Sequence, residues 1–247
     1  MLWDVDHTLI ETRGVGLAIY RLAFPAATGR PLAELAKISG RTELDIIRET
    51  LRINGVEPTS AAVDRLATAL IQGYEDARAE LAGQGRALPG AHDVLTSLGA
   101  NPAIFQTVLT GNLREVARIK LEVFGLDAFL DLDAGAYGDD HQERAMLVAL
   151  AQERARQRSR VPFGNDRTVL VGDTPNDVAA GLTAGARVLG IATGKTSLDE
   201  LRDAGATYTA KDLDEAASLL TTLAFEVPRQ EDHPHLYPNK TTTNDGG

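Results

Sequence analysis

The chain begins Met1-Leu2-Trp3-Asp4-Val5-Asp6-His7-Thr8-Leu9-Ile10, an apolar start that leads into an Asp-x-Asp-x-Thr segment. Side chains two residues apart on a strand point to the same face of a sheet, so Asp4 and Asp6 would lie close together. Neighbouring carboxylates repel each other unless a cation or a shared proton compensates. The pattern therefore favours a divalent-metal site, a nucleophile beside an acid or base, or both. The alternative is an Asx turn, in which Asp6 bonds to the nearby backbone.

Two later segments also end in polar side chains. The apolar Val108-Leu109 is followed by Thr110-Gly111-Asn112, and the apolar run at 168–172 leads into Asp173, with Asp177 four residues further on. In open parallel sheets, ligands bind outside the carboxyl ends of the strands. We therefore expect three strands to deliver polar groups to one edge of a parallel sheet.

With these motifs in this order, the chain resembles the haloacid dehalogenase-like superfamily of hydrolases over roughly residues 1–215. It looks most like the phosphatase branch with a small helical cap, which includes phosphoglycolate phosphatases and β-phosphoglucomutases. Asp-x-Asp-x-Thr followed by Gly-Asp-x-x-x-Asp about 170 residues later is a specific combination, whereas either motif alone is weak. The resemblance implies an α/β fold: a Rossmann-like parallel sheet core with helices on both faces, plus an inserted α-helical cap domain.

Length and composition set outer limits. A chain of 247 residues can form one large domain plus an insertion. The net charge of −10 and the lack of a visible basic patch argue against a nucleic-acid partner. The absence of cysteine excludes disulfides, thiolate catalysis and cysteine-based zinc sites. Without a long apolar run or a signal-peptide pattern, we expect a cytoplasmic protein, monomeric or homodimeric, that does not bind membranes.

The domain organisation follows from where strand patterns are missing. Residues 13 to about 88 are predicted to be helical, and apolar positions from Val63 to Leu81 recur at three- and four-residue spacing. The resemblance implies a cap at residues 15–87 and a core at 1–14 and 88–225. The linkers near 12–16 and 83–89 would act as hinges that let the cap close over the site and exclude water.

The two ends of the chain carry their own expectations. Only Met1 to Trp3 precede Asp4, so either the first strand is short or the protein begins upstream of Met1. The polar stretch 226–247 is expected to be a disordered tail, with His233 and His235 solvated and not bound to metal.

From Ala91 onward, strands alternate with helices, which predicts a parallel α/β sheet. Helices are expected at 91–100, 112–124, 142–157, 175–184 and 195–204. Strands are expected at 103–110, within 126–136, at 168–172, at 187–192 and from Tyr208. Asn112 and Glu115 suit a capping box, and Thr174 suits the cap of the helix that begins at Pro175.

The resemblance implies roles for the four acidic side chains. Asp4 would be the nucleophile that forms an aspartyl-phosphate, and it would also bind Mg²⁺. Asp6 would protonate the leaving oxygen and then activate water, and its main-chain carbonyl would complete the metal site. Asp173 would bind Mg²⁺ directly and Asp177 directly or through water. An aspartate at position 177 also suits the first turn of a helix for dipole reasons, and both roles can hold together.

The phosphate-binding group would be the turn between strand and helix. Thr110, with the backbone N–H groups of Gly111 and Asn112, would hold the transferring phosphoryl group, because a helix N-terminus attracts anions. The alternative is that Thr110-Gly111-Asn112 is only a turn.

The family also uses a cation, usually the lysine of a Lys-Pro pair that is absent here. Arg144 and Lys120 are the candidates. We expect Arg144 to fill the role, because it opens a helix after a glycine/aspartate loop, whereas the helix of Lys120 should run away from the site. Arginine can grip a phosphoryl group bidentately. His7 stands where the family most often has glycine, and we interpret it as a tolerated variant.

Substrate choice is expected to come from the cap. Ser39-Gly40-Arg41-Thr42 resembles the turn that faces the site in related caps, and Arg41 could meet a substrate carboxylate or a second phosphate. Equally, Thr42 could be the N-cap of a helix, with Arg41 in solvent.

The leading hypothesis is a Mg²⁺-dependent phosphatase that hydrolyses a small phosphorylated metabolite, phosphoglycolate-like or a sugar phosphate, through an aspartyl-phosphate. One alternative is a phosphomutase of the β-phosphoglucomutase type, and another is a non-catalytic protein that kept the fold. A dehalogenase is disfavoured by Asp6 and by the metal-binding acids, because dehalogenases of the family lack a carboxylate at the position of Asp6.

Overall fold

The computed structural model describes residues 1–225, and the predictions for the tail, His233 and His235 lie outside that range. The strands are β1 (Leu2–Trp3), β2 (Ile10–Glu11), β3 (Arg86–Ala87), β4 (Thr107–Val108), β5 (Val169–Gly172), β6 (Arg187–Ile191) and β7 (Tyr208–Ala210). The helices of the first half are α1 (Val15–Thr28), α2 (Glu43–Ile53), α3 (Ser60–Asp76), α4 (Arg78–Gln84), α5 (Ala91–Gly99) and α6 (Arg114–Val123). The later helices are α7 (Arg144–Ser159), α8 (Pro175–Thr183), α9 (Leu198–Asp203) and α10 (Leu213–Phe225), with short 3₁₀ turns at Asp127–Phe129, Leu132–Ala134 and Asn165–Arg167.

The central sheet has five parallel strands in the order β4-β1-β5-β6-β7. Trp3 of β1 lies opposite Val108 on one side and Val171 on the other. The three strands that precede the polar motifs are therefore adjacent, and their carboxyl ends meet at one edge. The predicted parallel α/β architecture is confirmed.

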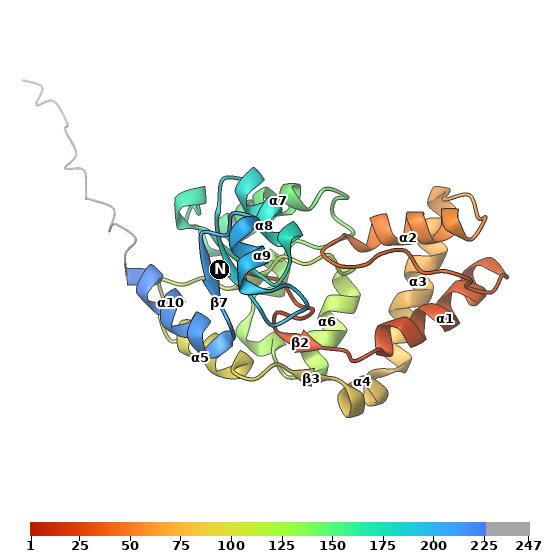
Figure 1. Ribbon diagram of the computed structural model, residues 1–247, viewed down its shortest axis with the longest axis horizontal. Coiled ribbons are helices and arrows are strands. Elements are labelled where there is room, and N and C mark those ends of the chain that lie inside the picture. Colours follow the sequence, from red (N-terminus) through yellow and green to blue (C-terminus); the bar gives the residue numbers. More distant parts are fainter. Residues whose placement is uncertain (226–247) are drawn as a thin grey trace, which may run out of the picture.

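The sheet residues alternate between two cores, as the period of two in a strand requires. Trp3, Val169 and Val171 pack into one cluster with helices α5 and α10, whereas Leu2 and Leu170 pack into a second cluster with α7 and α8. Figure 1 shows these helix pairs on opposite sides of the strands. Helices thus cover both faces, as expected for a doubly wound sheet.

Helices α1 to α4 form a separate helical unit beside the sheet (Figure 1). Its core includes Phe24, Ile47, Leu66 and Leu70, all buried. The chain enters the unit after β2 and leaves it through β3, and these two strands pair with each other in antiparallel fashion. This unit corresponds to the segment expected to be a cap.

Helix α6 belongs to both hydrophobic clusters. Ala117 and Leu121 pack with the sheet, whereas Leu113, Val116 and Ile119 pack with the helical unit. The helix is therefore apolar on two sides, and it joins the sheet to helices α1–α4.

Several local predictions were wrong. The strand expected within 126–136 is a pair of 3₁₀ turns followed by a single bridge between Leu109 and Ala136. The strand expected at 103–110 shortens to β4. The apolar segment from Val63 to Leu81, expected to be one helix, is divided at Ala77 into α3 and α4. Its apolar side chains are buried on both sides of the division, as Tyr74 and Leu81 show. The β2–β3 ribbon was missed because two-residue strands have no readable periodicity.

No helix within residues 1–225 is both long enough and apolar enough to cross a membrane.

Candidate active site

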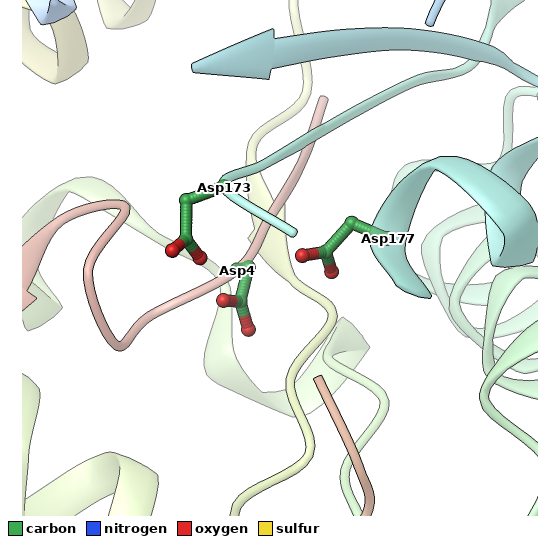
Figure 2. Close-up of side chains that lie close together, drawn as sticks. All are labelled: Asp4, Asp173 and Asp177. Carbon is green, nitrogen blue, oxygen red and sulfur yellow. The ribbon is translucent and has the colours of Figure 1, made fainter. Parts of the chain in front are cut away.

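Three buried carboxylates meet at the carboxyl edge of the sheet. Asp4 follows β1, Asp173 follows β5, and Asp177 lies in the first turn of α8. Figure 2 shows the three side chains converging from these separate segments. One carboxylate oxygen of each lies within 4.8 Å of the others. The strand-end pattern predicted polar groups at this edge, the resemblance implied that these three acids act together, and the structure brings all three together.

Local backbone chemistry fixes Asp177. Thr174 caps α8 and accepts the Asp177 N–H, while the Asp177 Oδ2 accepts the Thr174 N–H at 3.1 Å, which completes a capping box. The predicted cap is confirmed, and Asp177 is both a capping residue and a member of the acidic cluster. Glycine at position 194 makes room for Asp173, because a Cβ there would lie 1.8 Å from Asp173 Oδ2.

Arg144 lies inside the acidic cluster. Its Nη2 donates to Asp4 Oδ1 at 2.8 Å and to Asp177 Oδ1 at 2.5 Å. Its Nε is buried and has no hydrogen-bond partner within residues 1–225. Arg144, the cation expected near Asp4, therefore contacts Asp4 directly, and its Nε–H group is still available as a donor.

The cluster of Asp4, Asp173, Asp177 and Arg144 contains more negative than positive charge. Burial raises the pKa of Asp4 to about 7, although Arg144 opposes the rise. Burial and the neighbouring Asp4 and Asp177 raise the pKa of Asp173 to about 8. Three carboxylates and one guanidinium leave a net charge of −2 when all are ionised. Hard oxygen ligands with this charge fit a divalent cation such as Mg²⁺.

Asp6 lies in a different environment from Asp4. Lys120 Nζ donates to its Oδ1 and Oδ2 at 2.9 and 2.7 Å, and Asn112 Nδ2 donates to Oδ2 at 2.7 Å. Lys120 is buried, and its Nζ also meets Asn112 Oδ1 at 2.7 Å. The expectation that the Lys120 helix runs away from the site was wrong, because α6 crosses beside Asp6 and its side that carries Lys120 faces it.

These partners set the ionisation of Asp6. Burial alone would raise the pKa of its carboxyl, but Lys120 and the Asn112 hydrogen bond outweigh burial and lower it. Burial would lower the pKa of Lys120, and the charge of Asp6 raises it instead. The site thus contains two acid–cation groups: Asp4 with Arg144, and Asp6 with Lys120.

The Thr110-Gly111-Asn112 turn lies between these groups. Thr110 is buried, and its Oγ1 accepts the Asn112 side-chain amide at 2.8 Å. Asn112 was expected to cap α6, but the N-cap position is Leu113 and the Asn112 side chain is used by Asp6 and Lys120. The turn therefore orients Asp6, in addition to its expected place beside the phosphoryl group.

The helical unit reaches the turn through the segment 39–43, which we name the cap loop. The Glu43 N–H donates to Gly111 O at 2.7 Å, and Asn176 Nδ2 donates to Ser39 O at 3.2 Å. A Cβ at position 111 would lie 2.1 Å from the Arg41 carbonyl oxygen. The cap loop is therefore packed directly against the backbone of the turn.

The two expectations for the cap loop have different outcomes. Thr42 occupies the N-cap position of α2, but its Oγ1 donates to Gln142 O at 3.0 Å and does not cap the helix. The Arg41 Nε pairs with Asp45 at 2.7 Å, and its Nη1 donates to Lys37 O at 3.0 Å. Arg41 is thus partly exposed, and its partners Asp45 and Lys37 lie within the helical unit.

Three polar side chains of the helical unit were not predicted as site residues. Glu43 accepts a hydrogen bond from the Tyr20 hydroxyl, and Lys120 Nζ lies 5.1 Å from the centre of the Tyr74 ring. Burial raises the pKa of Glu43, while Tyr20 and Lys120 oppose the rise. Tyr74 is one of the apolar positions between Val63 and Leu81 that were predicted to form one helix face. No pattern in the sequence links it to Lys120.

His7 has a backbone φ of 60°, in the left-handed region that favours glycine. Its carbonyl accepts the Thr193 hydroxyl at 2.5 Å, and its side chain is exposed. The position therefore has a backbone reason to prefer glycine, which agrees with its interpretation as a tolerated variant.

A five-stranded parallel sheet, an acidic cluster at its carboxyl edge and a helical insertion between β2 and β3 define an α/β enzyme of the Rossmann-like class. The family model for haloacid dehalogenase-like hydrolases matches residues 1–181. The chain belongs to this family, and the predicted assignment to a hydrolase is confirmed.

Three individual proteins that this chain is similar to are 17–26% identical to it. A phosphoglycolate phosphatase of Agrobacterium fabrum is 26% identical over 202 residues, which cover 80% of this chain and 82% of the relative. A hydrolase from Pseudomonas syringae has a TM-score of 0.63 at 23% identity, with 90% and 97% of the two chains covered. A candidate β-phosphoglucomutase from Bacteroides vulgatus has a TM-score of 0.64 at 17% identity, covering 91% and 89%.

Proposed function

We propose that the protein is a Mg²⁺-dependent phosphatase that hydrolyses a small phosphate monoester through an aspartyl-phosphate on Asp4. The observation that carries the proposal is the contrast between the two carboxylates of the first motif. Asp4 is buried among other acids beside Arg144, whereas Asp6 is paired with Lys120 and its side chain is 34% exposed. Two carboxylates in distinct environments suit two distinct chemical roles. The phosphoglycolate phosphatase relative supports phosphomonoester chemistry.

In the first step, a carboxylate oxygen of Asp4 attacks phosphorus and the bond from phosphorus to the alcohol oxygen breaks. Asp6 gives a proton to the departing oxygen, and because Lys120 and Asn112 lower its pKa, the reacting form is its minor, protonated one. In the second step, Asp6 accepts a proton from water, water oxygen attacks phosphorus, and the Asp4 carboxylate is released together with inorganic phosphate. Because Lys120 and Asn112 hold both oxygens of Asp6, its position is fixed through both steps.

Arg144 and the turn would hold the transferring group. Arg144 reaches Asp4 and Asp177 through Nη2, and its partnerless Nε is a donor suited to a phosphoryl oxygen. Thr110 Oγ1 lies in the same turn as Gly111, next to the Asp6 partner Asn112. A phosphoryl group bound here would contact donors that are already oriented, which is the main requirement of phosphoryl transfer.

The residues suited to hold Mg²⁺ are Asp4, Asp173 and Asp177, with the main-chain carbonyl of Asp6 as the expected fourth protein ligand. Bound there, the ion would supply positive charge that offsets the charge of the phosphoryl oxygens and of Asp4.

The test is phosphate release from a panel of small phosphate esters, with Mg²⁺ or with EDTA, for the wild type and Asp4→Asn. We expect release that requires Mg²⁺ and disappears in Asp4→Asn. A folded protein that releases phosphate from no ester in the presence of Mg²⁺ contradicts the proposal. Release without any acceptor argues against the phosphomutase alternative, because a mutase must protect its aspartyl-phosphate from water.

A further inference from the structure

Lys120 has no N–H group left for a substrate. An ammonium carries three donors, and those of Lys120 meet Asp6 Oδ1, Asp6 Oδ2 and Asn112 Oδ1 at 2.9, 2.7 and 2.7 Å. Its side chain is 4% exposed. A carboxylate on the substrate could bind Lys120 only by breaking its pair with Asp6.

The cation of the cap loop, Arg41, is also paired within the protein, through its Nε and Nη1. Arg41 pairs with Asp45, four residues further along the cap, and with the carbonyl oxygen of Lys37. Both partners belong to the helical unit, so Arg41 is neutralised before any substrate arrives. The two cations named from the sequence as candidates for binding a substrate anion, Lys120 and Arg41, are thus each already paired with an acid of the protein.

Instead, the helical unit presents an acid to the site. The Glu43 N–H binds Gly111 O at 2.7 Å, which anchors the residue beside the phosphate-binding turn. Its carboxylate accepts the hydroxyl of buried Tyr20 and lies within electrostatic range of Lys120 and Asp6. The ring of buried Tyr74 lies next to Lys120. The helical unit therefore places a carboxylate beside the phosphate-binding turn and a phenol ring beside Lys120, the partner of Asp6.

We propose that Glu43 is a specificity-determining residue, which selects phosphate esters whose alcohol is uncharged or cationic and carries hydroxyl or ammonium donors. Esters with a carboxylate or a second phosphate on the alcohol are rejected. The inference deepens the proposed phosphatase function and rests on it. The alcohol oxygen must approach Asp6 to take its proton, so the remainder of the alcohol lies between Asp6 and the cap loop.

The physical basis is the partly buried charge of Glu43. A second anion placed beside it is repelled more strongly than in water, because the local dielectric is lower. A hydroxyl or ammonium group in the same place finds an acceptor oxygen. Of the two substrate types expected from the sequence, the inference favours a sugar phosphate over a phosphoglycolate-like ester.

The test compares two esters of nearly equal size, glycerol 3-phosphate and 3-phosphoglycerate, which differ by a carboxylate in place of a hydroxymethyl group. p-Nitrophenyl phosphate is assayed alongside to report the phosphatase chemistry itself. We expect the wild type to favour glycerol 3-phosphate in kcat/KM by at least about tenfold. Glu43→Gln, whose amide oxygen can still accept the Tyr20 hydroxyl, should bring the ratio of kcat/KM values close to one.

Two variants serve as controls. Glu49→Gln removes a carboxylate from the same helix, where it pairs with Arg52 at the surface, and should keep the wild-type ratio. Glu43→Asp keeps the charge and should keep the direction of the preference, which provides a second reading if Glu43→Gln folds poorly.

The outcomes separate the two proposals. Turnover with an unchanged ratio in Glu43→Gln, or a wild type that favours 3-phosphoglycerate, overturns the role of Glu43 and leaves the phosphatase intact. Absence of turnover with every ester, p-nitrophenyl phosphate included, overturns both.

Discussion

Lys120 Nζ lies 2.7 Å from Oδ2 and 2.9 Å from Oδ1 of Asp6, although 114 residues separate them in the chain. The same ammonium holds Asn112, which in turn contacts Thr110. One lysine thus fixes the acid–base candidate and the turn expected to hold phosphate. It does so from α6, a helix whose other residues pack the two hydrophobic clusters together.

Removing this cation should impair Asp6 more than the fold. In Lys120→Met, Asp6 loses the charge that lowers its pKa, so the carboxyl should titrate at higher pH. We expect kcat/KM to fall by about 10²-fold, the lower range for a misplaced general acid–base group. The acidic limb of the pH–rate profile should also move to higher pH. Lys211→Met, at an exposed lysine, is the matched control and should leave both quantities unchanged.

Loss of activity in Lys120→Met without a movement of the acidic limb would mean that Lys120 acts only in packing. Thermal unfolding of the variant, measured in parallel, shows how much of the fold it retains.

The acidic cluster makes stability depend on pH when no metal is bound. The unfolded pKa of aspartate is about 3.9, and the folded values of Asp4 and Asp173 are raised to about 7 and about 8. The folded protein therefore binds more protons than the unfolded chain between these values, and stability decreases as the pH rises. We expect the Tm in EDTA to fall between about pH 5.5 and pH 8.5.

Mg²⁺ should oppose this loss, because it binds the ionised carboxylates and competes with protons. The increase in Tm on adding Mg²⁺ is expected to be larger at pH 8 than at pH 6. Asp173→Asn should flatten the pH dependence in EDTA and reduce the response to Mg²⁺, whereas Asp199→Asn, at an exposed helix position, should change neither. A Tm in EDTA that rises steadily toward pH 8.5 would contradict the raised pKa values.

Close packing of the cap loop on the turn gives a steric prediction. In Gly111→Ala, the new Cβ would lie 2.1 Å from the Arg41 carbonyl oxygen, which is backbone and cannot rotate away. We expect the loop to be displaced and kcat/KM to fall by at least about tenfold, since misplacement by 1 Å can cost 10²-fold. Gly83→Ala is the control, because nothing lies within 4 Å of its added Cβ. Equal activity in the two variants would show that this contact has no part in turnover.

The backbone at His7 predicts a gain in stability. The left-handed conformation costs a residue with a Cβ roughly 1–2 kcal/mol, which glycine would avoid. Glycine also increases the entropy of the unfolded chain, which offsets part of this stabilisation. We expect His7→Gly to increase the free energy of unfolding by up to about 1 kcal/mol, with activity retained. Chemical denaturation measures this change, and a decrease would show that the exposed imidazole makes a stabilising contact.

Much of the fold and the acidic cluster could be predicted because the signals are local. An apolar run followed by a carboxylate marks the carboxyl end of a strand, and parallel strands bring such ends together regardless of sequence distance. Asp4 and Asp173 follow from this rule, and Asp177 follows from its place in the first turn of the helix after β5. Thr174 and Pro175 mark the start of α8 in the same local way.

The partners of Asp6 could not be predicted in this manner. Lys120 lies in the middle of α6, and the periodicity of that helix does not say which side meets the site. Glu43 reads as a first-turn residue of α2, where an acid is common for dipole reasons. Its second role depends on how the helical unit sits against Gly111, a relation between segments far apart in sequence.

The dual packing of α6 has a consequence for motion. A movement of α1–α4 away from the sheet would separate their apolar side chains from Leu113, Val116 and Ile119. Each square ångström of apolar surface exposed to water in this way costs about 25 cal/mol. The hydrophobic contact therefore favours the arrangement seen in the structure, in which α1–α4 stay packed on α6. If substrate entry and product release require this contact to open, each of them would carry the free-energy cost of hydrating that apolar surface.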